Sequence, residues 1–180
     1  MATTGIKYPS TISWPGSTNP DNARLNDAAR GTATVAVDVE TMISTWGYAL
    51  SIPTDATNIK IILHLTGSIT AGSFYSYHFC RNVDTGDPVS VSSRSVLPGA
   101  TETTTIASDD INGGVVWNKK TGSLAWTPAD LNDTFFGWQL AFGGTGTTNT
   151  ISVNSIGMEV TYDQPGATVG KTWWNGWGAA

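Results

Sequence analysis

The fold of this chain is indicated most clearly by residues 59–69, which read IKIILHLTGSI. One face of an extended chain here would carry Ile59, Ile61, Leu63 and Leu65, and the other Lys60, Ile62, His64 and Thr66. A period of two, with apolar residues on one side, predicts a β-strand that covers a core. Near the other end of the chain, Ile156, Met158, Val160 and Tyr162 alternate in the same way with Gly157, Glu159 and Thr161. Residues 148–162 therefore predict an antiparallel strand with one buried face.

Shorter strand signals lie on both sides of these stretches and are separated by clusters of Gly, Pro, Asn and Asp. They cover residues 32–39, 47–52, 74–83, 89–97, 101–107 and 135–142. Residues 39–46 also fit the spacing of a helix face, so helix and strand both remain open there. We expect residues 74–83 to form a hairpin with residues 59–69. Thr127 and Pro128 predict a single helical turn, because they suit the N-cap and the first helical position.

The number and spacing of these signals predict the fold class and the domain organisation. About eight or nine strands without recurring helices indicate an all-β fold, an antiparallel β-sandwich that is jelly-roll-like. Residues 32–165 would form this sandwich. Residues 1–31 are rich in Pro, Asn and Gly and predict an extended N-terminal arm. Residues 166–180 predict a Trp-rich C-terminal tail.

The tryptophans divide into two groups. The tail carries Trp173, Trp174 and Trp177. Leaving them in water would cost about 25 cal/mol per Å² of apolar surface, so we expect them to bind another subunit or a partner protein. Aromatic rings supply much of the buried area of a core, and we expect four more tryptophans there: Trp46, Trp117, Trp126 and Trp138. The alternative is that exposed aromatic side chains form a platform for a sugar ring.

Charge and cysteine content limit the partners. The chain has 180 residues, with 9 Lys and Arg against 14 Asp and Glu, which gives a net charge of −5. This balance disfavours nucleic acid and anionic membranes as partners. A single cysteine rules out an internal disulfide. We expect no signal peptide and no transmembrane helix, because the N-terminus lacks a basic and apolar leader and no apolar run is long enough.

No motif in the sequence predicts a bound cofactor or metal. Residues 166–172, GATVGKT, resemble a phosphate-binding loop but place three residues between the glycines where four are needed. His64, His78 and Cys80 are too few ligands for a zinc site. Four loop acids lack the terminal Glu of a calcium loop and are interpreted as solvated turn residues: Asp84, Asp87, Asp109 and Asp110.

Catalytic motifs are missing from the sequence as well. It contains no Gly-x-Ser-x-Gly elbow, and the three glutamates Glu40, Glu102 and Glu159 show no context typical of a glycosidase pair. The residues at 132–134, NDT, match a glycosylation sequon, which we regard as meaningless without a secretion signal. The sequence therefore predicts a protein that is not an enzyme.

Two segments of the chain resemble virion proteins of tailed bacteriophages. The first opens with NPDNA at residues 19–23 and continues to IP at 52–53 and AT at 56–57. The second closes with VTY at residues 160–162. The order of these motifs is similar to that in appendage or surface components of such virions, and the resemblance covers residues 14–162.

The resemblance implies a structural role in a virion. The chain would be a head decoration, head fibre or tail appendage subunit, made in the host cytoplasm and assembled through its arm or its tail. Its partners would be other copies of itself, in a closed symmetric assembly, and other virion proteins. A host surface glycan stays open as a further partner. The alternative function is a carbohydrate- or receptor-binding β-sandwich module.

Overall fold

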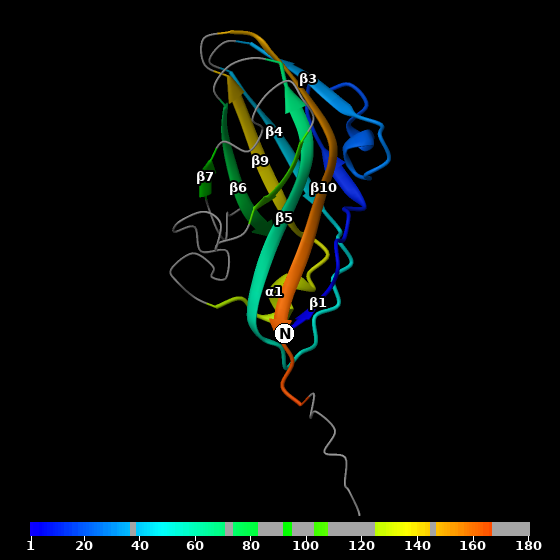
Figure 1. Ribbon diagram of the computed structural model, residues 1–180, viewed down its shortest axis with the longest axis vertical. Helices are drawn as coiled ribbons and strands as arrows, with labels where there is room; N and C mark the ends of the chain where they lie inside the picture. Colours follow the sequence, from blue (N-terminus) through cyan, green and yellow to red (C-terminus); the bar gives the residue numbers. More distant parts are fainter. Residues whose placement is uncertain are drawn as a thin grey trace, which may run out of the picture.

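The computed structural model describes residues 1–36, 39–70, 74–82, 92–94, 103–107, 125–144 and 147–166. Within these ranges the chain forms two antiparallel sheets of five strands each, packed face to face around one core (Figure 1). Sheet A has the strand order β1-β10-β5-β8, with β3 also paired to β10, and sheet B has the order β2-β4-β9-β6-β7. The predicted antiparallel sandwich is confirmed, while its jelly-roll connections stay a prediction.

The strands of the two sheets differ greatly in length. Sheet A consists of β1 (Ala2–Thr3), β3 (Gly31–Val35), β5 (Thr57–Ile69), β8 (Thr103–Ala107) and β10 (Asn149–Asp163). Sheet B consists of β2 (Thr11–Ser13), β4 (Glu40–Trp46), β6 (Phe74–Asn82), β7 (Ser92–Arg94) and β9 (Phe136–Gly144). The long strands β5 and β10 lie side by side and form the centre of sheet A (Figure 1).

The alternation predicted for both long strands is confirmed by their pairing. Leu63 lies opposite Met158 and Ile61 opposite Val160, and all four side chains are fully buried. Burying each of them contributes about 1.5–3 kcal/mol relative to leaving it in water. The residues between them, such as Glu159, are partly exposed on the outer face of sheet A.

Sheet B supplies the opposite wall of the core. Ile43 of β4 and three alternating residues of β9, Trp138, Leu140 and Phe142, are fully buried. β4 pairs with β9 along its whole length, from Glu40 opposite Gly143 to Trp46 opposite Gly137. This pairing excludes the helix that the spacing of residues 39–46 had left open.

The N-terminal residues, predicted as an extended arm, instead run along the sandwich. β1 pairs with β10, Lys7 forms a bridge with Met158, and β2 pairs with β4. A 3-10 helix, η1 (Pro20–Ala23), then packs Ala23 fully into the core. The composition of this segment misled the prediction, because an edge strand is held by unpaired backbone groups of its neighbour rather than by its own side chains.

Residues 47–52 form no strand, contrary to the pattern of their side chains. Tyr48, Leu50 and Ile52 are buried while Ala49 and Ser51 are exposed, which produces a strand-like alternation. The backbone nevertheless leaves the strand conformation, since Gly47 and Ala49 have φ angles of 75° and 49°.

The hairpin predicted between residues 59–69 and 74–83 is also wrong. β6 pairs with β9 and β7 in sheet B, whereas β5 pairs with β10 and β8 in sheet A. Consecutive strands with matching patterns can pack on opposite sides of a sandwich as readily as they pair, and the pattern does not distinguish the two cases.

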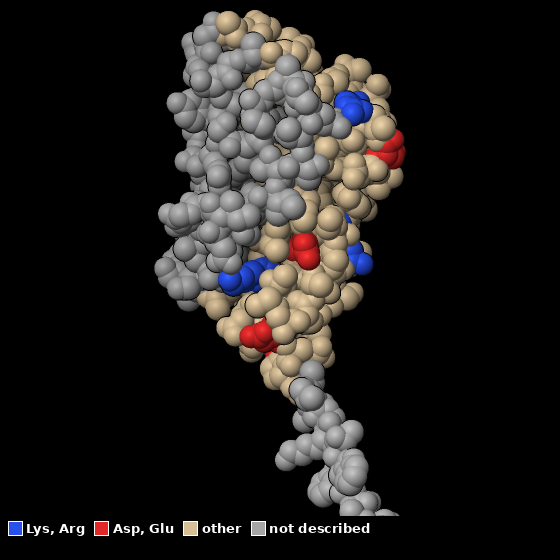
Figure 2. All heavy atoms as spheres, in the orientation of Figure 1, with Lys and Arg blue, Asp and Glu red and all other residues tan. Residues whose placement is uncertain are grey.

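The predicted helical turn is confirmed as α1 (Pro128–Leu131). The Thr127 hydroxyl accepts a hydrogen bond from the Asp130 N–H, and the Asp130 carboxylate accepts one from the Thr127 N–H at 2.8 Å. This capping box fixes the turn and buries Leu131. Among the described residues, no helix has the length and apolar character needed to cross a membrane. On the face seen in Figure 2, the described Lys, Arg, Asp and Glu are scattered and form no patch of one sign.

Candidate functional site

An open pocket lies at one edge of sheet B, beside the end of β4. Its volume is about 460 Å³. Residues 46–50 form one wall and residues 131–136 form the other, while Ser10 and Thr11 of the N-terminal segment line a third side. We refer to this hollow as the Trp46 pocket.

The first wall begins at Trp46, the last residue of β4, whose side chain is half-buried. The next residue, Gly47, turns the chain away from the sheet at a φ of 75°, a conformation that favours glycine. A Cβ on Gly47 would lie 2.1 Å from Oγ of Ser10, and the positive φ disfavours any larger residue. The Ser10 N–H donates to the Gly47 carbonyl at 3.1 Å. This hydrogen bond holds Ser10 beside the turn that follows Trp46.

The second wall is shaped by a tight turn centred on Asp133. Its Oδ1 accepts a hydrogen bond from the Phe135 N–H at 2.8 Å, and its carbonyl accepts one from the Phe136 N–H at 3.1 Å. The turn sends the two successive rings in opposite directions. Phe135 is 42% exposed at the rim, whereas Phe136 is buried and meets Trp126 edge-on at 5.5 Å between ring centroids.

Asn132 joins the two walls through its side-chain amide. Oδ1 accepts a hydrogen bond from the Ile52 N–H at 2.8 Å, and Nδ2 donates to the Ile52 carbonyl at 2.8 Å. The side chain thus takes the place of a partner peptide group for a residue that lies outside any strand. This double hydrogen bond keeps the loop after α1 at a fixed distance from the loop after β4.

The floor of the pocket is apolar and is anchored in the core. It consists of the buried side chains of Tyr48, Leu131 and Phe136. The Tyr48 hydroxyl shares a hydrogen bond of 2.7 Å with Oγ1 of Thr45 and donates to the carbonyl of Ile156 in sheet A at 3.3 Å. The floor is therefore tied to both sheets, and the arrangement can receive an apolar ring face below a polar rim.

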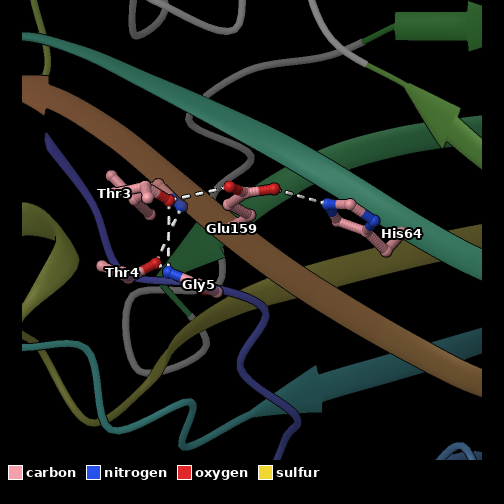
Figure 3. A network of polar contacts seen from close by, with 6 residues as sticks. Thr3, Thr4, Gly5, His64 and Glu159 are labelled. Carbon is pink, nitrogen blue, oxygen red and sulfur yellow. Dashed lines mark hydrogen bonds and ion pairs between the residues drawn. The ribbon is translucent and has the colours of Figure 1, made fainter. Parts of the chain in front are cut away.

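A second polar cluster, which we call the Glu159 cluster, lies on the outer face of sheet A (Figure 3). Oε2 of Glu159 lies 2.9 Å from Nε2 of His64, and Oε1 accepts a hydrogen bond from the Thr3 hydroxyl at 2.7 Å. Oγ1 of Thr3 also accepts from the Gly5 N–H at 3.1 Å. The His64 and Glu159 side chains are 12% and 23% exposed.

The order of these groups does not suit nucleophilic catalysis. A catalytic hydroxyl must contact the histidine that removes its proton, with the carboxylate on the far side of the ring. Here the carboxylate lies between the hydroxyl and the imidazole (Figure 3). The cluster instead fastens the N-terminal segment to β10 and β5.

The structure brings only part of the sequence-predicted aromatic set together. Trp126 and Trp138 lie in the core, as expected. Trp46 does not: it is the last residue of β4, it is only partly buried, and it lines the pocket. The other predicted tryptophans lie outside the described residues, and so do the loop acids weighed as calcium ligands: Trp117, Trp173, Trp174 and Trp177, with Asp84, Asp87, Asp109 and Asp110.

Metal binding finds no support in the part of the chain that the structure describes. No group of three or more His, Cys, Asp or Glu side chains comes together there. The residues that sequence reasoning missed are Asp133 and Phe135 of the second wall. A signal existed, since NDT at 132–134 is a turn-forming cluster directly after a capped helical turn and before an aromatic pair.

Comparison with known proteins finds similar solved structures at low sequence identity. No family model and no curated sequence matches it. An arabinose-bound α-L-arabinofuranosidase structure has a TM-score of 0.48 at 7% identity over 87% of this chain, which spans 23% of that enzyme. A xylan-binding module has a TM-score of 0.42 at 14% identity over 88% of this chain and 90% of its own.

A third solved structure completes this picture. The family 11 carbohydrate-binding module from Clostridium thermocellum, in complex with a mixed-linked tetrasaccharide, has a TM-score of 0.41 at 7% identity. It is covered over 85% of its length, and this chain over 87%. The pairing of its own strands defines this chain as an antiparallel β-sandwich.

Proposed function

We propose that this protein is a glycan-binding module and that the Trp46 pocket holds the sugar. The observation that carries the proposal is that two aromatic residues, the partly buried Trp46 and the 42% exposed Phe135, line one pocket with an apolar floor. Sugar rings present apolar C–H faces that pack on aromatic rings. Their hydroxyls need hydrogen-bond partners around the rim.

The dimensions and the rigidity of the pocket support this proposal. Its volume of about 460 Å³ lies in the usual range for small-molecule sites, roughly 300–1,000 Å³. Hydroxyl side chains of Ser10, Thr11 and Thr134 lie among the lining residues. Hydrogen bonds of Asn132 and Tyr48 fix both walls and the floor. Binding therefore costs little conformational entropy in the protein.

The test is binding of the full chain to an array of neutral oligosaccharides, followed by calorimetric titration of those that bind. Phe135→Ala and Trp46→Ala should each lower the affinity for the tightest-binding oligosaccharide by about tenfold or more, as expected for an aromatic group at the centre of a binding site. Leu25→Ala is a matched control, since Leu25 is 50% exposed and does not line the pocket. An array without any ligand that depends on these two rings would overturn the proposal.

The virion role implied by the resemblance stays a prediction, and its expected anchors change. Residues 1–13 pair with both sheets of their own sandwich, so they are not available as a free arm while those strands stay paired. The remaining anchor is the tail with Trp173, Trp174 and Trp177. Light scattering on the full chain and on a form ending at Gln164 tests it: an oligomer that becomes monomeric on truncation supports the role, and two monomers argue against a tail-mediated assembly.

A further inference from the structure

Two hydroxyl side chains of the N-terminal segment lie side by side in the Trp46 pocket. Oγ of Ser10 is 3.5 Å from Oγ1 of Thr11, and both residues line the pocket. Thr11 of β2 is paired with Trp46 of β4, and residues directly opposite each other in an antiparallel pair share one face of the sheet. The next residue, Ile12, packs against the core instead. The hydroxyl pair therefore lies next to Trp46, at the edge of sheet B.

The two hydroxyls can make more hydrogen bonds than their mutual contact uses. A serine or threonine hydroxyl offers one donor and two acceptor lone pairs. A contact of 3.5 Å is long for a hydrogen bond between hydroxyls and engages one group of each side chain at most. Ser10 is exposed and Thr11 is half-buried, so a ligand in the pocket can reach both. Two hydroxyls on neighbouring carbons of a sugar ring form a close pair of the same kind.

The backbone of Ser10 is held from both sides. Its N–H donates to the Gly47 carbonyl at 3.1 Å, and its carbonyl accepts a hydrogen bond from the guanidinium of Arg24. Arg24 follows the fully buried Ala23 at the end of η1, and its own N–H donates to the Asp21 carbonyl at 3.2 Å. Its Nε also lies 3.5 Å from Oδ1 of Asp21. Arg24 does not line the pocket, so its contact with the site is made through Ser10.

From these contacts we infer that Ser10 and Thr11 bind two adjacent hydroxyls of the sugar that packs on Trp46, and that Arg24 is a positioning residue for this pair. The inference rests on the proposed function and names the part of the sugar that the same site recognises. A sugar ring that packs flat on an aromatic side chain directs its equatorial hydroxyls sideways, toward groups beside that side chain. Arg24 holds Ser10 in place before the ligand arrives, which lowers the entropic cost of binding. The ligand class is a sugar chain whose units carry free hydroxyls on neighbouring carbon atoms.

The first experiment removes one hydroxyl from every such pair of the ligand. The probes are methyl glycosides of β-1,4-linked hexasaccharides of glucose, galactose, mannose and xylose, in which the C2 and C3 hydroxyls are free. Their 3-deoxy forms contain no two adjacent hydroxyls. In titrations of the full chain, we expect a parent sugar to bind about three- to tenfold more tightly than its 3-deoxy form, the effect of one or two lost hydrogen bonds. In the double variant Ser10→Ala, Thr11→Val this ratio should fall to near unity, while valine keeps the branched shape of threonine.

A double-mutant cycle tests the positioning role of Arg24. Arg24→Met removes the guanidinium and should lower the affinity for the parent sugar by about two- to fivefold. In a Ser10→Ala background the same substitution should have little further effect, because Arg24 acts through that hydroxyl. Arg24→Lys should restore part of the affinity, since its ammonium group can donate to the Ser10 carbonyl. Arg30→Met is the matched control: Arg30 donates to the carbonyl of Ala28 and does not line the pocket.

The outcomes distinguish this inference from the proposed function. An unchanged ratio between parent and 3-deoxy sugars in the Ser10→Ala, Thr11→Val variant, with binding still lost in Trp46→Ala, would overturn the recognition of adjacent hydroxyls and leave the glycan site intact. Binding that depends on Trp46 but is confined to sugars without adjacent hydroxyls would overturn it as well. Additive effects of Arg24→Met and Ser10→Ala would remove Arg24 as a positioning residue. Absence of any binding that depends on Trp46 would instead overturn the proposed function.

Discussion

The Glu159 cluster on sheet A and the Trp46 pocket beside sheet B contain similar residue types but differ in structure: the first is a closed network of hydrogen bonds and the second is an open hollow. Each combines a carboxylate with hydroxyl groups of the N-terminal segment, Thr3 in one case and Ser10 and Thr11 in the other. In the cluster both carboxylate oxygens of Glu159 are engaged within the protein. In the pocket, aromatic rings keep an open hollow beside Asp133. The polar side chains of the Glu159 cluster thus stabilise the attachment of the N-terminal segment to sheet A. Those of the pocket line an open hollow beside aromatic rings.

The largest effect is expected from removing the link between the pocket walls. Asn132→Ala leaves the N–H and the carbonyl of Ile52 without their partner, at a cost of about 2–3 kcal/mol for two hydrogen bonds. Glycan affinity should fall as well, because the walls are no longer held apart at a fixed distance. Chemical denaturation measures the first effect and titration the second. Asn132→Asp keeps the acceptor but sets a carboxylate oxygen against the Ile52 carbonyl in place of the donor, so it should destabilise the chain at least as much as the Ala variant.

A smaller effect is expected from breaking the Glu159 cluster. Glu159→Ala removes the hydrogen bonds to Thr3 and His64 and should lower the free energy of unfolding by about 1 kcal/mol, since both groups are partly exposed. Glycan affinity should stay unchanged, because the cluster does not line the pocket. Amide exchange of residues 2–7 should become faster as the segment loosens. A loss of glycan binding in this variant would contradict the separation of the two regions.

The smallest effect concerns the end of β10. A hydrogen bond at 2.8 Å from Nδ2 of Asn58, with a smaller contribution from the N-terminal amine, lowers the pKa of Asp163 below its ordinary value. Asp163 therefore adds stability above the pKa it has in the unfolded chain, and loses it as pH falls through the lower folded value. Asn58→Gly, which suits the φ of 51°, should bring this pKa back toward normal. An NMR titration of Asp163 measures it, and an unchanged pKa would show that the N-terminal amine dominates.

Local physics explains which parts of the fold were predictable. The alternation in residues 59–69 and 156–162 identified β5 and β10, because a sheet with one buried face imposes a period of two. Thr127 and Pro128 identified α1, because capping involves only neighbours in sequence. Residues 47–52 showed the same period of two without forming a strand, since Gly47 and Ala49 have positive φ angles. The Gly47 carbonyl accepts a hydrogen bond from Ser10, which is distant in sequence.

The candidate site was less predictable than the fold. Trp46 was expected in the core, and its position at the end of a strand gave no reason to doubt it. Trp46 lines a pocket because residues 131–136 approach it from a distant part of the chain. The hydrogen bonds between Asn132 and Ile52 hold this segment in place. Contacts of this kind join residues about eighty positions apart, and no local pattern records them.

The sequence by itself determined the all-β class, the two central strands, the capped turn and the low charge of the chain, because each follows from neighbouring residues or from composition. Only the tertiary structure decided that the N-terminal residues pair with both sheets and that β5 and β6 belong to opposite sheets. It also decided that Trp46, Asp133 and Phe135 surround one hollow. The physical reason is that edge pairing and pocket walls depend on which backbone groups and rings are left uncovered after the core has formed.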